Sequence, residues 1–158
     1  MTDNAAAYFV LEDDIYIGQD PTRGPWSPDH CHAGPVAGAI ARTVEHLVGA
    51  EKDLVRLTIN LMRPIPLRGF RIEAEITRDG RSVANTTATL KDLDGRICAT
   101  ATSMHITPQQ FPNMPTTSTP PLSRTEALPG AFPLSQALHQ LPLIRRVKPK
   151  SRDQPPYG

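Results

Sequence analysis

One carboxylate and two imidazoles lie within four positions of one another, at Asp29, His30 and His32. A histidine titrates near neutral pH, so either imidazole could accept or release a proton during a reaction. Together with the carboxylate it could act on one carbonyl group. The spacing marks a candidate acid–base site. A hydrogen bond at the start of a helix explains His32 equally well, and a capping or turn position explains Asp29.

Cys31 lies between the two histidines and allows two further interpretations. A metal site is the first, but the His30-Cys31-His32 run has no second pair of ligands downstream, so we predict no metal. A nucleophilic thiol is the second, and we prefer a small buried thiol to it. Cys98 is the other cysteine. The two cysteines do not indicate a disulfide framework.

The residues that follow have the pattern of a helix. Pro35 suits the first helical position, and Gly49 marks the C-terminal end. The spacing of five apolar residues predicts the buried stripe: Val36, Ile40, Val44, Leu47 and Val48. N–H groups from Gly34 onward lie at the positive end of the helix dipole, where they could polarise a carbonyl group. Gly34 and Gly38, with the nearby alanines, leave one side almost without side chains. That side suits close packing on a sheet or the approach of a thin ligand.

After the helix the apolar period changes from 3.6 to 2, which indicates strands over residues 55–61, 70–77, 82–90 and 96–106. Hairpin turns are predicted at Asp79-Gly80 and Asp94-Gly95, and a first short hairpin at residues 8–17. The pattern places the following residues on the core face: Val55, Leu57, Ile59, Leu61, Ile97, Ala99, Ala101 and Ser103. We predict an α+β fold in which a curved antiparallel sheet wraps around one central helix.

Three segments in this order carry a resemblance to a known family: His32-Ala33-Gly34-Pro35-Val36-Ala37-Gly38-Ala39, Leu61-Met62-Arg63-Pro64 and Arg78-Asp79-Gly80-Arg81-Ser82-Val83. They are similar to a paired-glycine helix start, a strand end and the hairpin between two long strands. In these features the chain resembles the hotdog fold, in particular the N-terminal repeat of the acyl-CoA thioesterase II family. The resemblance covers roughly residues 8–106.

The resemblance implies an acyl-CoA thioesterase that hydrolyses fatty or other acyl thioesters with activated water and without a cofactor. Such a reaction needs an oxyanion site, a group that activates water and a tunnel for the acyl chain. The resemblance makes Gly34 the candidate oxyanion donor, and Asp29 and His32 the candidate acid–base groups. An enoyl-thioester hydratase fits poorly because its Asp/x/Asn/Pro/x/His motif is absent.

In single-domain hotdog thioesterases with a similar His/Gly/Gly start, an acid about nine residues after the histidine acts as base or nucleophile. The matching position here is Ala41. Glu45 lies one turn further along on the same face. A surface or ion-paired glutamate explains Glu45 more simply.

The phosphates of coenzyme A require arginines at the mouth of a pocket. Four arginines lie at strand ends or turns of the predicted sheet: Arg63, Arg68, Arg78 and Arg81. We prefer Arg81 with Ser82, because the matched hairpin lies near the substrate cleft in the resembled fold. Arginines that keep a sheet edge soluble are the alternative. Gly38 allows close approach of an acyl chain, and Trp26 could line an acyl pocket or close the core, of which we favour the core.

We expect two parts, a hotdog domain over residues 1–107 and a Pro-rich, basic and mostly disordered tail over residues 108–158. The tail contains 11 of the 17 prolines, and a single short helix is expected near residues 134–143. Five cations lie near its end although the net charge is only +1: Arg145, Arg146, Lys148, Lys150 and Arg152. We predict a solvated tail, not a nucleic-acid-binding arm.

The resembled family usually continues into a second hotdog repeat, which supplies its main catalytic polar residues, and here the tail looks like a remnant of the linker. The alternative function is therefore a non-catalytic hotdog subunit that binds acyl-CoA or completes a partner. A lone hotdog leaves a sheet edge unpaired, so we expect a homo-oligomer, at least a dimer, or a partner hotdog subunit. Since no signal segment and no run of 18 apolar residues is present, we expect a cytoplasmic protein without a membrane span.

Overall fold

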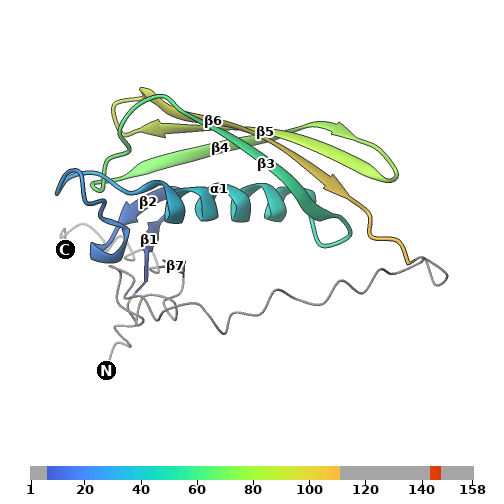
Figure 1. The fold of residues 1–158 in the computed structure, drawn as a ribbon, viewed down its shortest axis with the longest axis horizontal. Coiled ribbons are helices and arrows are strands. Elements are labelled where there is room, and N and C mark those ends of the chain that lie inside the picture. Colours follow the sequence, from blue (N-terminus) through green and yellow to red (C-terminus); the bar gives the residue numbers. More distant parts are fainter. Residues whose placement is uncertain (1–6, 111–142, 147–158) are drawn as a thin grey trace, which may run out of the picture.

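The structure, a computed structural model, describes residues 7–110 and 143–146. Within these residues, one helix, α1 (Ala33–Val48), lies along the concave side of a curved seven-stranded sheet (Figure 1). The spatial order of the strands is β3-β6-β5-β4-β2-β1-β7. The other elements are β1 (Phe9–Glu12), β2 (Ile15–Gly18), the 3-10 turn η1 (Asp20–Thr22), β3 (Asp53–Leu61), β4 (Phe70–Asp79), β5 (Val83–Asp92), β6 (Ile97–Ile106) and β7 (Ile144–Arg146).

The four long strands β3 to β6 pair in antiparallel fashion and form the curved part of the sheet. The predicted turns at Asp79-Gly80 and Asp94-Gly95 join β4 to β5 and β5 to β6. At Gly95 the backbone has φ of +81°, a conformation that glycine adopts without strain. β1 and β2 form the predicted short hairpin. The prediction of an α+β fold with an antiparallel sheet around one helix is confirmed.

Helix α1 begins two residues earlier than predicted, at Ala33, so Pro35 is its third residue. This position also suits proline, because the first N–H groups of a helix have no partner within it. The buried face of α1 consists of Pro35, Val36, Ala39, Ile40 and Val44. Leu47 continues the same stripe but is 41% exposed, so the buried contact ends one turn before the predicted stripe does.

Two irregularities in strand register move apolar residues away from their predicted faces. A shift between Leu54 and Arg56 in the pairing of β3 with β6 puts Leu54 against the core, while Val55 is 54% exposed. A second shift lies where β5 pairs with the start of β6, and it leaves Cys98 buried and Ile97 37% exposed. The predicted core positions of Val55 and Ile97 are therefore wrong, because a β-bulge reverses the alternation of side chains. The predicted core position of Leu61 is also wrong, because this last residue of β3 lies outside the core cluster and is 56% exposed.

Three aromatic rings close one end of the core. Phe9 of β1 meets Phe70 of β4 edge to face at 5.5 Å between ring centroids, and Tyr16 of β2 stacks on Phe70 at 5.4 Å. The Tyr16 hydroxyl lies 3.1 Å from Thr43 Oγ1 on α1. The first hairpin is thereby joined both to the long strands and to the helix.

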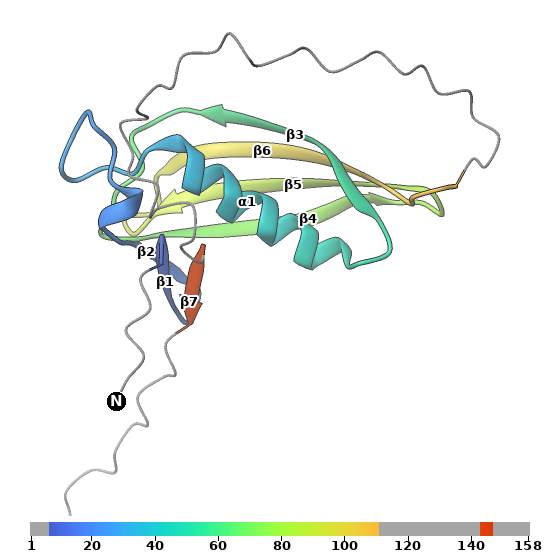
Figure 2. The same cartoon turned by 60° about the horizontal axis from the view of Figure 1, so that its bottom comes forward.

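The short strand β7 pairs in parallel with β1 and forms the outer edge of the sheet there (Figure 2). The backbone N–H of Phe9 donates to the carbonyl oxygen of Leu143 at 2.9 Å, and Leu143 packs against the core. This segment comes from the region predicted to be a tail. The remainder of that region, with the predicted short helix and Lys148, Lys150 and Arg152, lies outside the described residues apart from residues 108–110.

The aromatic cluster should dominate the stability of the domain. Phe70→Ala is expected to lower the free energy of unfolding by about 3–5 kcal/mol, because it removes a fully buried ring. The half-exposed Val55→Ala on β3 should change it by no more than about 0.5 kcal/mol. Urea denaturation of both variants tests this, and similar losses in the two would contradict the described core.

Candidate functional site at the start of the helix

The loop that leads into α1 is tied down by backbone hydrogen bonds. The N–H of Gly24 donates to the carbonyl of His30 at 2.9 Å, and that of His32 donates to Thr22 at 2.9 Å. A second set joins the loop to the segment before β4: the Cys31 N–H donates to Ile65 at 2.8 Å, and the Leu67 N–H to Asp29 at 2.9 Å. The N-terminus of α1 is therefore held in place before any ligand arrives.

His32 caps the helix. Its Nδ1 accepts a hydrogen bond from the backbone N–H of Gly34 at 3.4 Å. An accepting Nδ1 carries no proton, so the neutral ring bears its proton on Nε2. Ala33 and Gly34 are exposed, and their N–H groups lie at the positive end of the helix dipole. Because this hydrogen bond is long, the Gly34 N–H can give it up and donate to a substrate oxygen instead.

Asp29 and His30 line a groove of about 500 Å³ beside this loop. The walls of the groove also include residues 17–20, at and after the end of β2, and residues 66–68 before β4. The Asp29 backbone N–H donates to Ser27 Oγ at 3.2 Å. Of the predicted site residues, His32 and Gly34 are in contact at the start of the helix, and Asp29 lies three residues before His32 in the groove.

Trp26 lies on the same loop and is 89% exposed. The interpretation that it closes the core is therefore wrong. Trp26 lies between Pro25 and Pro28, and backbone hydrogen bonds hold the loop on either side of this segment, at Gly24 and Asp29. No sequence pattern distinguishes such a turn from one that points the ring inward. The exposed indole is a large apolar surface beside the helix start.

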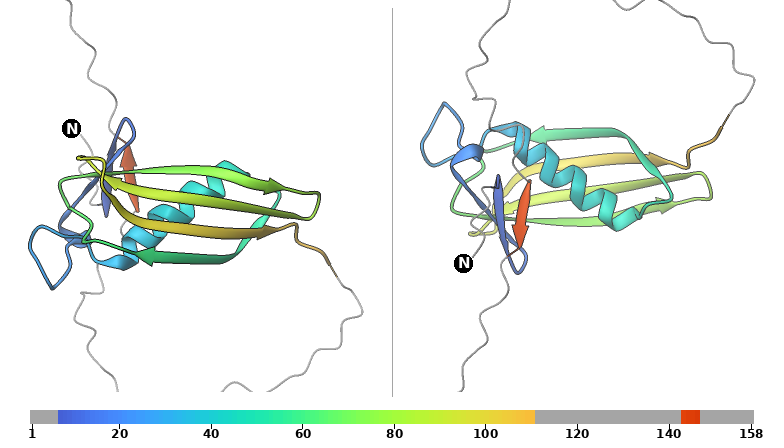
Figure 3. Two further views of the ribbon diagram at one scale, coloured as in Figure 1. Left: turned by 90° about the horizontal axis from the view of Figure 1, so that it is seen from above. Right: turned by 90° about the horizontal axis from the view of Figure 1, so that it is seen from below.

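The other predicted substrate-binding residues lie elsewhere. Gly38 is half-buried, and a side chain there would meet both methyl groups of Leu143 at 3.4 Å. Arg81 and Ser82 are exposed at the β4–β5 turn, which lies at the C-terminal end of α1 (Figures 1 and 3). Within one chain the structure does not bring this pair together with Asp29, His32 and Gly34.

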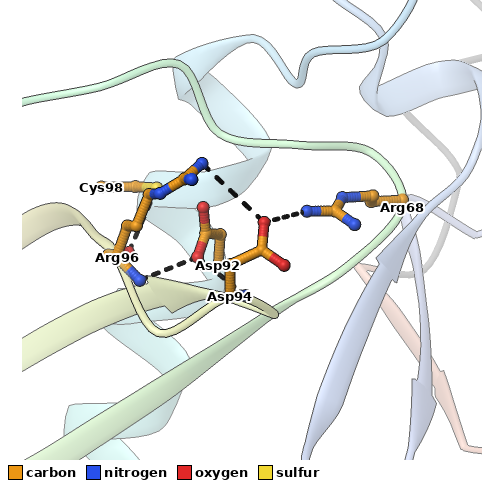
Figure 4. A network of polar contacts seen from close by, with 5 residues as sticks. All are labelled: Arg68, Asp92, Asp94, Arg96 and Cys98. Atoms are coloured by element: carbon orange, nitrogen blue, oxygen red, sulfur yellow. Dashed lines mark hydrogen bonds and ion pairs between the residues drawn. The ribbon is translucent and has the colours of Figure 1, made fainter.

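Arg68, by contrast, lies at the end where the helix starts. Its Nη2 donates to Asp94 Oδ2 at 2.5 Å, and Arg96 lies 3.9 Å from the same oxygen (Figure 4). Asp92 Oδ1 accepts the backbone N–H groups of Asp94 and Arg96 at 3.0 and 2.8 Å, so it shapes the turn that presents Asp94. This network fixes the orientation of the Arg68 guanidinium.

Sequence reasoning missed a buried polar chain near the other end of the helix. Thr86 Oγ1 lies 2.6 Å from Ser103 Oγ, which lies 2.8 Å from His105 Nε2, and all three side chains are buried. His105 Nδ1 has no hydrogen-bond partner among the described residues. Burial lowers the pKa of His105, while the Glu45 carboxylate raises it by a smaller amount. The predicted inward position of Ser103, a polar residue on an apolar face, was the available signal.

Glu45 is exposed and lies in a second groove of about 640 Å³ at the C-terminal end of α1, with His46, Lys52 and Asp53. It is about 16 Å along the helix from Gly34, since each residue adds 1.5 Å. Glu45 therefore does not reach the candidate site at the helix start of its own chain.

Cys31 is a poor nucleophile in this setting. Burial raises the pKa of its thiol to about 12, so the thiol is protonated at neutral pH. In the described residues there is no group of three or more His, Cys, Asp or Glu side chains that could hold a metal ion. The described part of the chain also contains no helix with the length and apolar character needed to cross a membrane.

Several solved structures share this architecture. The protein smu.793 from Streptococcus mutans UA159, bound to acetyl CoA, has a TM-score of 0.54 at 16% identity over 60% of this chain and 79% of that chain. A hypothetical thioesterase with coenzyme A from Streptococcus pneumoniae TIGR4 has a TM-score of 0.54 at 16% identity, over 63% of this chain and 83% of that chain. Zebrafish thioesterase superfamily member 2 has a TM-score of 0.52 at 18% identity, over 65% of this chain and 78% of that chain. The fold is thus the hotdog fold.

A match to a family model identifies the family within this fold. Residues 22–106, more than half of the 158 residues, match the model of the acyl-CoA thioesterase N-terminal domain. The chain belongs to the acyl-CoA thioesterase N-terminal domain family. Among curated proteins there is no significant sequence match.

The buried His105 should make stability depend on pH. Its pKa in the folded protein is lowered from 6.5, so below about pH 6.5 the unfolded chain binds a proton that the native state does not. Stability should therefore fall as the pH decreases from 6.5 towards the lowered pKa. Urea denaturation between pH 5 and 8 should show a shallower loss for His105→Gln than for the unsubstituted protein. Equal slopes would contradict the buried neutral imidazole.

The two thiols should be unreactive in the native protein. Burial raises the pKa values of both Cys31 and Cys98. We expect a thiol-specific dye at pH 8 to react at least about 100-fold more slowly with the native than with the urea-unfolded protein, because little thiolate is present. Rapid reaction of Cys31 in the native state, followed with Cys98→Ser, would show that its environment differs from the one described.

Proposed function

We propose that this domain hydrolyses acyl-CoA thioesters at the N-terminus of α1. The observation that carries the proposal is the exposed, dipole-aligned N–H of Gly34, fixed beside Asp29 and His32 in a domain of the acyl-CoA thioesterase family. Two of the similar solved structures are described with acetyl CoA or coenzyme A, which supports the same class of ligand here. The finer assignment, to the N-terminal repeat of the acyl-CoA thioesterase II family, is part of this proposal.

In the proposed reaction the thioester carbonyl oxygen accepts the N–H of Gly34 in place of His32 Nδ1. Negative charge that develops on this oxygen is stabilised by the helix dipole. Asp29 or His32 takes a proton from a water molecule whose oxygen attacks the carbonyl carbon. The carbon–sulfur bond then breaks, the proton passes to the leaving sulfur, and the products are a carboxylic acid and the free thiol of coenzyme A.

For the acyl chain we propose the surface beside the helix start, with the exposed Trp26 as its first apolar contact. Gly38 lies one turn further along α1, where Leu143 now packs against it. The acyl chain of the substrate would follow this small-residue side of the helix. Arg81 and Ser82, on the β4–β5 turn at the other end of α1, are not assigned to this site.

We also propose that the domain works as an oligomer, either with itself or with a partner hotdog subunit. β3 ends the strand order, so its outer edge has no neighbouring strand in the described residues. Three apolar side chains on and after this strand are more than half exposed: Val55, Leu61 and Met62. Ala41, where an acid is expected, favours the second candidate function, a non-catalytic subunit that binds acyl-CoA.

Thiol release from a panel of acyl-CoAs, from acetyl to palmitoyl, tests the hydrolase directly. Asp29→Ala and His32→Ala should each lower kcat/KM, and the one that activates water should lower it by about 100-fold or more. Glu45→Ala, at the far end of the helix, should leave it unchanged. Acyl-CoA binding without thiol release would instead support the non-catalytic subunit, and equal activity in all three variants would place the chemistry elsewhere.

A further inference from the structure

One wall of the groove beside the loop into α1 is held together by backbone hydrogen bonds. The Gly18 N–H donates to the Leu67 carbonyl at 2.9 Å, which joins the end of β2 to the segment before β4. A Cβ at Gly18 would lie 2.5 Å from Leu67 Cδ2 and 3.4 Å from Leu67 Cα, so glycine lets the two segments pack closely. The Leu67 N–H in turn donates to Asp29. Three segments that are distant in sequence thus form one rigid wall of a groove of about 500 Å³.

Two guanidinium groups line this groove, from different walls. Arg23 donates through Nη2 to Asp20 Oδ1 at 2.8 Å and through Nη1 to the Pro28 carbonyl, and its side chain is 44% exposed. Arg68 is held through Nη2 by Asp94, and its side chain is 60% exposed. A guanidinium has five N–H donors, and these contacts use only some of them. Each arginine is therefore oriented by a carboxylate while it can still donate to a ligand.

For recognition of a ligand, the fixed positions of the two guanidinium groups matter more than the net charge of the groove. Asp20 and Asp29 line it together with the two arginines, so the charges of these four groups cancel. A simple cation-rich patch would attract any anion. Here the fixed forks of Arg23 and Arg68 favour a ligand with phosphate groups placed to meet them. Asp20 competes with such a ligand for Arg23.

The position of the groove connects it to the candidate site. Asp29 and His30 line the groove, and the chain enters α1 three residues after His30. The groove therefore lies next to the helix start along the chain, although its lining ends at His30. The β4–β5 turn, which carries Arg81 and Ser82, lies at the opposite end of the helix (Figure 3).

We infer that this groove binds the phosphates of the coenzyme A nucleotide through Arg23 and Arg68, while the thioester lies at the helix start. The inference rests on the proposed function, because it identifies where the same substrate is held. It assigns phosphate recognition to residues 23 and 68 in place of the Arg81 and Ser82 pair.

Calorimetric titration of the full chain with coenzyme A, adenosine 3′,5′-bisphosphate and pantetheine tests the assignment. Arg23→Gln and Arg68→Gln should each weaken binding of coenzyme A and of the bisphosphate about tenfold, and leave pantetheine binding unchanged. Asp20→Asn should tighten both about threefold, because it frees Arg23. Arg56→Gln, an exposed arginine on β3 and the matched control, should change neither.

The assignment is overturned if coenzyme A binds no more tightly than pantetheine, or if Arg68→Gln binds like the unsubstituted protein. It is also overturned if Arg81→Gln, and not Arg68→Gln, weakens the bisphosphate. If an arginine variant does not fold, Asp20→Asn still decides, since unchanged or weaker binding contradicts the groove. Hydrolysis of an acyl-pantetheine is measured separately. If binding depends on Arg68 but no hydrolysis occurs, the assignment of phosphate binding to the groove is supported and the proposed hydrolase is refuted.

Discussion

One face of α1 is buried against the inner surface of the sheet, and the position of the candidate site follows from that contact. The helix contacts all four long strands. Small or β-branched residues on this face, such as Ala39 and Val44, let the helix axis lie close to a strongly curved sheet. Because the helix cannot shift along the sheet without losing this packing, its N-terminus has a fixed place. The N–H of Gly34 is therefore presented at a defined point.

Backbone hydrogen bonds convert this fixed helix start into a site. The loop of residues 23–31 contains two prolines and has no apolar stripe of its own, so side-chain packing alone would not order it. Its carbonyl and N–H groups instead pair with Ile65 and Leu67 and, between Gly24 and His30, with each other. Such bonds order a loop without covering it. Asp29, His30 and Trp26 consequently stay accessible while their backbone is held, which suits residues that must meet a substrate.

Local periodicity was sufficient to predict most of the fold. The 3.6-residue period of α1, the alternation in the long strands and the two Asp-Gly turns each depend on neighbouring residues, and each was confirmed. The faces of Val55 and Ile97 were wrong because a bulge inserts one residue, and nothing in the sequence at Leu54 or Cys98 marks it. The parallel pairing of β7 with β1 joins residues more than 130 positions apart, so no local pattern contains it.

The candidate site was only partly predictable for the same reason. Asp29, His32 and Gly34 are close in sequence, and their proximity in space follows from that. Arg68 and Arg81 look alike in sequence, since both lie beside a turn. Only the topology shows that the first lies at the start of α1 and the second at its end. The exposure of Trp26 and the buried chain from Thr86 to His105 depend on tertiary packing in the same way.

The claim on which this account depends is that the start of α1, and not its C-terminal end, receives the acyl-CoA. Backbone amide NMR of the full chain during titration with coenzyme A tests it most directly. We predict that the largest shift changes fall on residues 17–34 and 66–68, with the Gly34 amide among them. Changes concentrated on residues 45–54 and 78–83, at the far end of the helix, would contradict the account.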